Sequence, residues 1–130
     1  MREIKFRGKD RNTGEWFYGN YYDKDTKGNT HICNQYKGSL VIAPETVGQF
    51  TGLYDKNGKE IYDGDICRME TGRCSHFVYM SVEWNMESAA FGFRLKGETY
   101  IGCSEAFRRW IAEGRVEVIG NIHDNPELIN

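Results

Sequence analysis

The sequence lacks the features that mark membrane and secreted proteins. None of its 130 residues falls in an apolar run long enough to span a bilayer. The opening segment, residues 1–5, has no apolar core of the kind found in a secretory signal. We therefore expect a cytoplasmic protein with no membrane partner. Its four cysteines lie far apart and would be reduced in that compartment.

Motifs for several kinds of catalysis are also missing. The chain has no Walker A loop, no G-x-S-x-G and no H-E-x-x-H. Its formal net charge is -2, so it has no overall basic excess to attract nucleic acid. We expect no cofactor and no catalytic residue, and thus a protein that is not an enzyme.

Aromatic residues are plentiful, at 14% of the chain. Such rings bury large areas, so they can fill a core, and they argue against disorder. Residues 15–23 hold five of them, which predicts a strand covered on both faces.

Periodicity predicts a mainly β protein. Val78, Met80, Val82 and Trp84 alternate along one strand, and residues 91–95 alternate along the next, which predicts an antiparallel hairpin. One short helix is predicted over residues 105–113, with Trp110 on its apolar stripe. The chain holds about eight to ten such short strands, which favours a small, partly open β-barrel architecture.

The domain organisation follows from the same pattern. We expect one compact domain of residues 1–130, with two lobes as the alternative. Residues 1–52 would form an N-terminal β meander. Residues 53–130 run as strand, long loop, hairpin, short helix and closing strand, a layout that resembles SH3-like barrels.

The most distinctive stretch of the chain specifies backbone geometry. Asn57 and Gly58 tolerate positive φ and predict a tight turn. Asp63, Gly64 and Asp65 predict a second bend just before a strand. We interpret these five residues as structural turn residues.

Three blocks of the sequence together resemble the YopX family of phage and prophage proteins. They are the opening residues 2–9 with the nearby residues 13–19, the middle run 46–66, and the ending 118–128. The resemblance spans both ends and the middle of the chain. It implies a mainly β, phage-encoded protein in the cytoplasm of a host bacterium, and it supplies no catalytic residues.

Two sets of side chains are weighed as sites of chemistry. His31 and Cys33, with Cys74 and His76, would form a tetrahedral zinc site if the two pairs met, although the tight knuckles of zinc sites are absent. Asp63 and Asp65 would hold a divalent ion, or share a proton, if they were not turn residues. We favour scattered thiols and turn chemistry over a metal or acid–base site.

The aromatic residues of the first lobe leave two kinds of partner open. Trp16, Tyr18 and Tyr22, beside Arg7 and Lys9, are the candidate binding surface. A small barrel would use them to stack the bases of a single strand. Tyr and Trp are also enriched in protein interfaces, and self-association would cover edge strands. We expect a homo-oligomer acting through protein–protein contacts and keep nucleic acid as the alternative.

Overall fold

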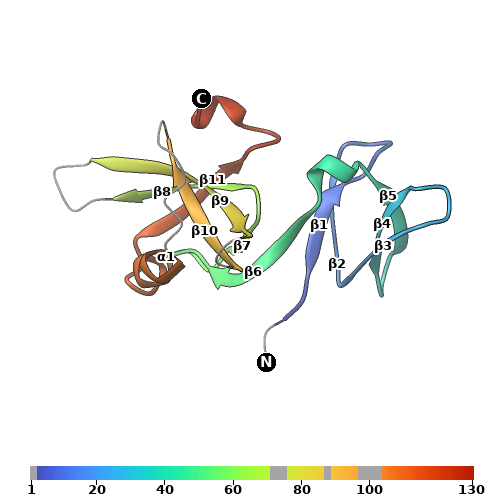
Figure 1. The fold of residues 1–130 in the computed structure, drawn as a ribbon, viewed down its shortest axis with the longest axis horizontal. Helices are drawn as coiled ribbons and strands as arrows, with labels where there is room; N and C mark the ends of the chain where they lie inside the picture. Colours follow the sequence, from blue (N-terminus) through green and yellow to red (C-terminus); the bar gives the residue numbers. More distant parts are fainter. Residues whose placement is uncertain (1–2, 71–75, 87–88, 97–103) are drawn as a thin grey trace. The chain divides into compact units, whose positions relative to one another are not determined.

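The structure is a computed structural model that describes residues 3–70, 76–86, 89–96 and 104–130, with the backbone alone for residues 104–107 (Figure 1). The chain divides into two compact units, Met1–Gly52 and Leu53–Asn130. Each is described by itself. None of the helices in the described part of the chain is long and apolar enough to cross a membrane.

The N-terminal unit is built from short antiparallel strands. β1 (Phe6–Lys9) pairs with β2 (Trp16–Gly19) on one side and with the start of β6 (Gly48–Tyr54) on the other. A second sheet has the order β3 (Tyr21–Lys24), β4 (Thr30–Asn34), β5 (Gly38–Ile42). The 3-10 turn η1 (Pro44–Thr46) connects β5 to β6.

The core of this unit lies between the inner faces of its two sheets. Phe17, Ile32 and Ile42 are buried there. The Ile42 side chain packs directly on the backbone of Gly8, where an added Cβ would meet a methyl carbon of Ile42 at 2.3 Å. An isolated bridge, Asp10 to Ile42, links the two sheets at one corner, and the Asn20 N–H donates to the Cys33 carbonyl at 3.1 Å.

The C-terminal unit has a four-stranded antiparallel sheet. Its order is β10 (Ala90–Leu95), β9 (Phe77–Asn85), β8 (Asp65–Glu70), β11 (Val116–Asn121). β7 (Glu60–Tyr62) follows β6 across a tight turn and lies next to it in the sheet order. The unit also contains α1 (Ser104–Ala112) and the 3-10 turn η2 (Pro126–Leu128).

One face of this sheet carries the second core. Met80, Val82 and Phe93 alternate on the β9–β10 hairpin and are buried. α1 packs onto the same cluster through Trp110, whose ring lies 5.0 Å from that of Phe93. The apolar stripe of the helix thus covers the apolar face of the hairpin, because both need to be removed from water.

The mainly β fold and its short helix are confirmed, and the helix begins and ends one residue earlier than predicted. In the described residues the strands form three antiparallel sheets, and none of these closes into a barrel. The aromatic strand predicted over residues 15–23 is broken at Asn20 into β2 and β3, which lie in different sheets. At this break Gly19 lies against the Cys33 carbonyl, which an added Cβ would meet at 2.2 Å, and the Asn20 N–H donates to the same carbonyl at 3.1 Å.

Candidate functional site

Four of the five residues predicted as a binding surface share one face of the β1–β2 pair. The register places Arg7 opposite Tyr18 and Lys9 opposite Trp16. Side chains of directly opposed residues point to the same side of a sheet. The other side carries Phe17 and faces the core. The alternation of β1 and β2 therefore gathers two cations and two rings on the side away from the core.

The cations of this face already contact one of its rings. The Arg7 guanidinium lies 4.6 Å and the Lys9 ammonium 5.5 Å from the centre of the Trp16 ring, both within cation–π range. Arg7 is only 5% exposed, whereas Tyr18 is 42% exposed. Of these four, Tyr18 is the one whose ring is most open to a partner.

Tyr22, the fifth predicted residue, lies elsewhere. It is opposite the buried Ile32 in the β3–β4 register, and its ring centre is 5.7 Å from that of Phe6. It therefore leans on the core side of the second sheet. The structure does not bring Tyr22 to the face that carries Trp16.

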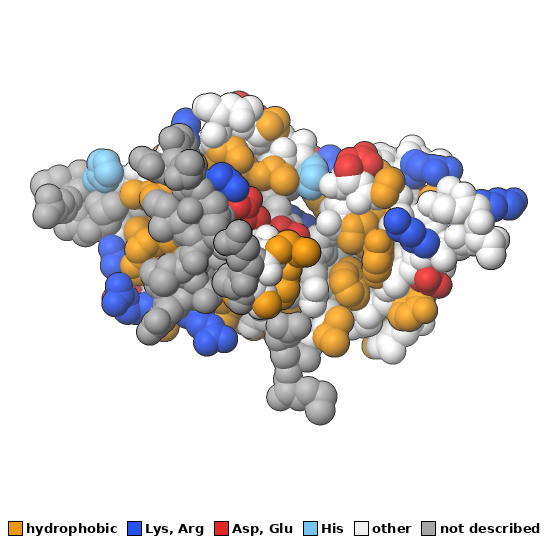
Figure 2. Space-filling model, viewed as in Figure 1, with side chains coloured by type: hydrophobic (Ala, Val, Ile, Leu, Met, Phe, Trp, Pro, Cys, Tyr) orange, Lys and Arg blue, Asp and Glu red, His pale blue; other side chains and the backbone are white. Residues whose placement is uncertain are grey.

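The side chain of Asn34 is hydrogen-bonded to the backbones of two exposed tyrosines, Tyr18 and Tyr36. Its amide nitrogen donates to the Tyr18 carbonyl at 2.7 Å, and its amide oxygen accepts from the Tyr36 N–H at 2.8 Å. Tyr21 lies opposite Cys33, the residue before Asn34. We call Tyr18, Tyr21 and Tyr36 the tyrosine corner. Tyr21 is 58% and Tyr36 86% exposed, and hydrophobic side chains lie open on the surface of this unit in Figure 2.

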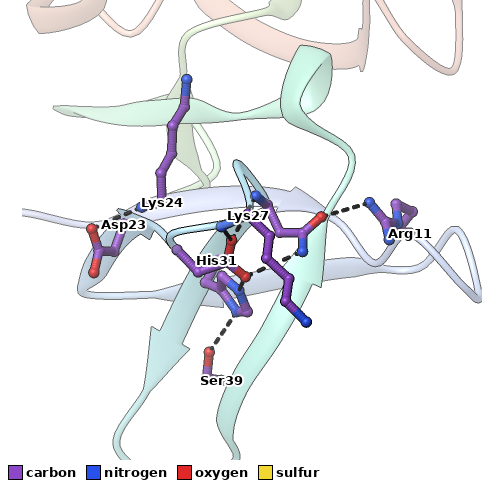
Figure 3. A network of polar contacts seen from close by, with 8 residues as sticks. Arg11, Asp23, Lys24, Lys27, His31 and Ser39 are labelled. Carbon is purple, nitrogen blue, oxygen red and sulfur yellow. Dashed lines mark hydrogen bonds and ion pairs between the residues drawn. The ribbon is translucent and has the colours of Figure 1, made fainter.

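A polar network occupies the outer face of the second sheet (Figure 3). His31 Nε2 lies 2.9 Å from Asp25 Oδ2, and His31 Nδ1 lies 3.2 Å from Ser39 Oγ. Asp25 Oδ1 accepts from the Lys27 and Asn29 N–H groups, each at 2.9 Å. The hydrogen bond with His31, followed by that with the Asn29 amide, holds the pKa of the Asp25 carboxyl well below its usual value. Asp25 therefore stays ionised at neutral pH.

Gly58 and Gly64 both have positive φ, the conformation that tight turns require. Gly58 has φ +81°, and its N–H donates to the Asp55 carbonyl at 3.0 Å. Gly64 has φ +93°, and Asp65 Oδ2 accepts from the Tyr62 N–H at 2.7 Å while only 2% of Asp65 is exposed. Asp65 is thus used to close the bend that precedes β8.

The Asp55 carboxylate accepts three backbone hydrogen bonds. Its Oδ1 accepts from the Asn57 N–H at 2.8 Å and from the Lys59 N–H at 2.9 Å. Its Oδ2 accepts from the Val118 N–H of β11 at 3.0 Å. In addition, the Lys56 N–H donates to the Val116 carbonyl at 3.0 Å. The turn is therefore fastened to the edge of β11.

The residues weighed as metal ligands are placed as follows. His31 and Cys33 point to the same outer face of β4, and both His31 ring nitrogens have the partners given above. His76 belongs to the other unit, and Cys74 lies outside the described residues. Among the residues that the structure does describe, no three His, Cys, Asp or Glu side chains gather as a metal site.

A charged pocket of about 260 Å³ lies on the outer face of the C-terminal sheet. Glu117 Oε1 is 3.1 Å from Arg68, and its Oε2 is 3.4 Å from Lys56. Partial burial would raise the pKa of Glu117, but the hydrogen bond with Lys56 and the charge of Arg68 lower it overall. The Arg68 guanidinium also lies 4.7 Å from the centre of the Phe77 ring. The ion pairs of Glu117 with Arg68 and Lys56 tie these side chains to one another on the solvent-facing side of the sheet. We therefore interpret the pocket as part of a charged surface rather than as a binding site.

Sequence reasoning missed the His31 network. A signal for it was present, because Asp25-Thr26-Lys27-Gly28 repeats the Asp-x-x-Gly spacing of Asp55-Lys56-Asn57-Gly58. Gly28 has φ +84°, close to that of Gly58, and its N–H donates to the Asp25 carbonyl at 3.0 Å. The two turns therefore have the same backbone hydrogen bond and the same positive φ at glycine.

Comparisons with known proteins identify the family and the fold. No curated protein matches the chain. The crystal structure of protein EF1440 from Enterococcus faecalis is similar, with a TM-score of 0.55 and 21% identity over 100% of both chains. At that identity the likeness concerns the fold alone. The family model described as YopX protein matches residues 5–130, and the chain therefore belongs to the YopX family.

Proposed function

We propose that this YopX family protein is a phage- or prophage-encoded accessory protein, working in the cytoplasm of its host bacterium. It acts through protein–protein contacts and associates with a second copy of itself. The observation that carries the proposal is the exposure of the tyrosine corner, Tyr18, Tyr21 and Tyr36, two of whose backbones are hydrogen-bonded to the Asn34 side chain.

The exposed area of the tyrosine corner is a substantial part of what a protein–protein interface needs. A Tyr or larger ring buries about 150–250 Å² when covered. With exposures of 42%, 58% and 86%, the three rings offer roughly 400 Å². A stable interface needs about 800 Å² per partner. The corner would thus supply about half of one side of an interface.

A second copy is the occupant that fits this surface best. In a two-fold dimer the same patch meets itself, and rings stack on rings without an unpaired charge. Asp23, Lys24 and Lys37 are exposed and close to Tyr21 or Tyr36 in the sequence, so they offer both signs of charge for the rim of such an interface. The four residues of β3, an edge strand of its sheet, are all exposed and would be covered at the same time.

The test is the solution mass by light scattering at low micromolar concentration, at low and high salt. We expect about twice the monomer mass of 15.1 kDa, with little effect of salt. The double variant Tyr21→Ser/Tyr36→Ser should be monomeric. Tyr54→Ser is the matched control, because Tyr54 is 47% exposed but lies in the C-terminal unit. A monomeric wild-type protein up to about 100 µM, a hundredfold above a µM dissociation constant, would refute self-association.

Single-stranded nucleic acid is a second candidate partner, favoured by charge and position. The N-terminal unit has eight Lys and Arg against six Asp and Glu, a net of +2, whereas the C-terminal unit has nine against thirteen. Arg7, Lys9, Trp16 and Tyr18 lie on one face of this more basic unit. Against this, Arg7 is buried and the Trp16 ring already holds two cations.

This alternative predicts binding that weakens steeply with salt and with loss of an aromatic ring. Fluorescence anisotropy of a labelled mixed oligonucleotide at 50 and 500 mM salt measures it. Tyr18→Ala should weaken binding, whereas Tyr54→Ala should not. Equal binding by the wild type and Tyr18→Ala would exclude stacking on this face.

A further inference from the structure

The Asp25–His31–Ser39 network orders three side chains as an acid, a base and a hydroxyl. They come from three places in the second sheet: the β3–β4 turn, β4 and β5 (Figure 3). His31 and Ser39 are diagonal neighbours, because Ser39 lies opposite Cys33 and Val41 lies opposite His31. This chain of contacts includes none of the three residues of the tyrosine corner, although Tyr21 and Ser39 both lie opposite Cys33 in the same sheet.

The carboxylate determines which nitrogen of His31 carries the proton. An ionised carboxylate only accepts hydrogen bonds, so Nε2, at 2.9 Å from Asp25 Oδ2, must carry a hydrogen. In the neutral ring Nδ1 is then an acceptor. The Ser39 hydroxyl, at 3.2 Å from Nδ1, therefore donates its hydrogen to it. A hydroxyl that donates to a histidine oriented by a third group is the arrangement of an activated nucleophile.

The carboxylate is itself fixed in position. Asp25 Oδ1 is held by the two turn amides, and Asn29 Nδ2 donates to Oδ2 at 3.2 Å. The turn is braced by Arg11, whose Nη1 donates to Asn29 Oδ1 at 3.2 Å. The base is thus oriented by a group that cannot rotate away without breaking the turn, which is what a preorganised site requires.

We propose that Ser39 is a nucleophilic hydroxyl, activated by His31, that accepts acyl groups from activated carboxylic esters. Ser39 Oγ attacks the carbonyl carbon while its proton passes to His31 Nδ1. The ester C–O bond then breaks, and the leaving alkoxide or phenoxide takes the proton from Nδ1. The products are O-acyl Ser39 and a free alcohol or phenol, with neutral His31 restored. No oxidant or reductant is needed.

The exposure of Ser39 determines which esters can serve as acyl donors. Ser39 is exposed on β5, an edge strand of its sheet, so a bulky or surface-borne ester can reach it. The nitrogen roles are the reverse of those in Ser-His-Asp hydrolases, where the carboxylate holds Nδ1. An ester with a good leaving group, such as an aryl ester, is the appropriate donor, because it needs least help in losing its leaving group.

The experiment treats the full-length protein with p-nitrophenyl acetate. Intact mass and peptide mapping locate the added acetyl group, and nitrophenolate release gives the rate. We expect one acetyl group on Ser39. His31→Gln should lower the rate of Ser39 acetylation 10²-fold or more, in line with loss of a general base. Asp25→Asn should lower it less, because the base remains. Thr13, an exposed hydroxyl that accepts from the Glu15 N–H, is the internal comparison.

The outcomes separate activation from background chemistry. Ser39→Ala must abolish the acetylated peptide, and Ser39→Thr, which keeps a hydroxyl, should retain part of it. Circular dichroism and urea midpoints show that each variant is folded. Acetylation confined to lysines, a Ser39 rate equal to that of Thr13, or an unchanged rate in folded His31→Gln would overturn the proposal.

Discussion

Removal of the Asp55 carboxylate should destabilise the C-terminal unit strongly. In Asp55→Ala three backbone N–H groups lose their acceptor, those of Asn57, Lys59 and Val118. The Val118 N–H is on a buried residue, and leaving it unsatisfied costs about 1–3 kcal/mol. The two turn N–H groups lie on exposed residues, where water can bond to them in place of Asp55. The remaining cost is about 0.5–1.5 kcal/mol for each. We expect a total of about 2–6 kcal/mol.

The chain contains its own matched control. Asp25 makes the same two turn hydrogen bonds, but its Oδ2 faces His31 and Asn29 on the surface instead of a buried amide. Asp25→Ala should therefore destabilise much less than Asp55→Ala. The difference between the two variants compares the loss of the buried bond to Val118, whose partners are 63 residues apart in the chain, with the loss of the exposed contacts to His31 and Asn29.

Urea unfolding gives the free energy for each variant, and hydrogen exchange at the Val118 amide reports directly on the lost bond. Asp55→Asn, which keeps one carbonyl oxygen, should fall between the wild type and Asp55→Ala. A loss below about 1 kcal/mol in Asp55→Ala, or equal losses in the two alanine variants, would refute the reasoning, because a buried unsatisfied amide costs at least that much.

Three further predictions concern single sites. Gly58→Val should cost about 2 kcal/mol because φ is +81°, whereas Gly58→Asn should be tolerated; thermal unfolding of both checks this. Trp110→Ala should cost about 2–3 kcal/mol by urea unfolding, less than for a fully buried ring, because Trp110 is only half-buried against Phe93. Since the folded-state pKa of Asp25 is depressed, its stabilising contribution is present above the unfolded value of about 3.9 and is lost as the pH falls below it. The urea midpoint of Asp25→Asn should therefore fall less between pH 7 and pH 3 than that of the wild type.

Local patterns in the sequence were enough to predict the C-terminal hairpin and the helix. Val82 and Phe93 lie opposite one another on the face of the sheet that carries the core. Trp110 belongs to the helical stripe that packs against the same core. In both cases the apolar residues that line the core recur with the period of their element, so periodicity was enough to find them. The turn at Gly58 could also be predicted from the sequence, because few residue types other than glycine and asparagine adopt a φ near +81°.

The N-terminal unit was harder to predict because its aromatic residues are divided between two sheets. Trp16 and Tyr18 lie on the outer side of one sheet, whereas Tyr22 leans on Phe6 at the core side of the other. At the break between them Gly19 approaches Cys33 closely, which is a contact in space. Asn34 likewise joins residues 16 positions apart.

The two Asp-x-x-Gly turns show how one local structure can serve two purposes. In each turn one carboxylate oxygen accepts from two backbone N–H groups of the turn. The second oxygen can therefore bond to a group outside those two amides. At Asp55 this second oxygen meets a buried N–H of β11 and holds the sheet edge in place. At Asp25 it meets His31 beside an exposed serine hydroxyl. The turn fixes the carboxylate in both cases, and the neighbour that the fold brings to the second oxygen decides whether the fixed charge stabilises a strand or orients a base.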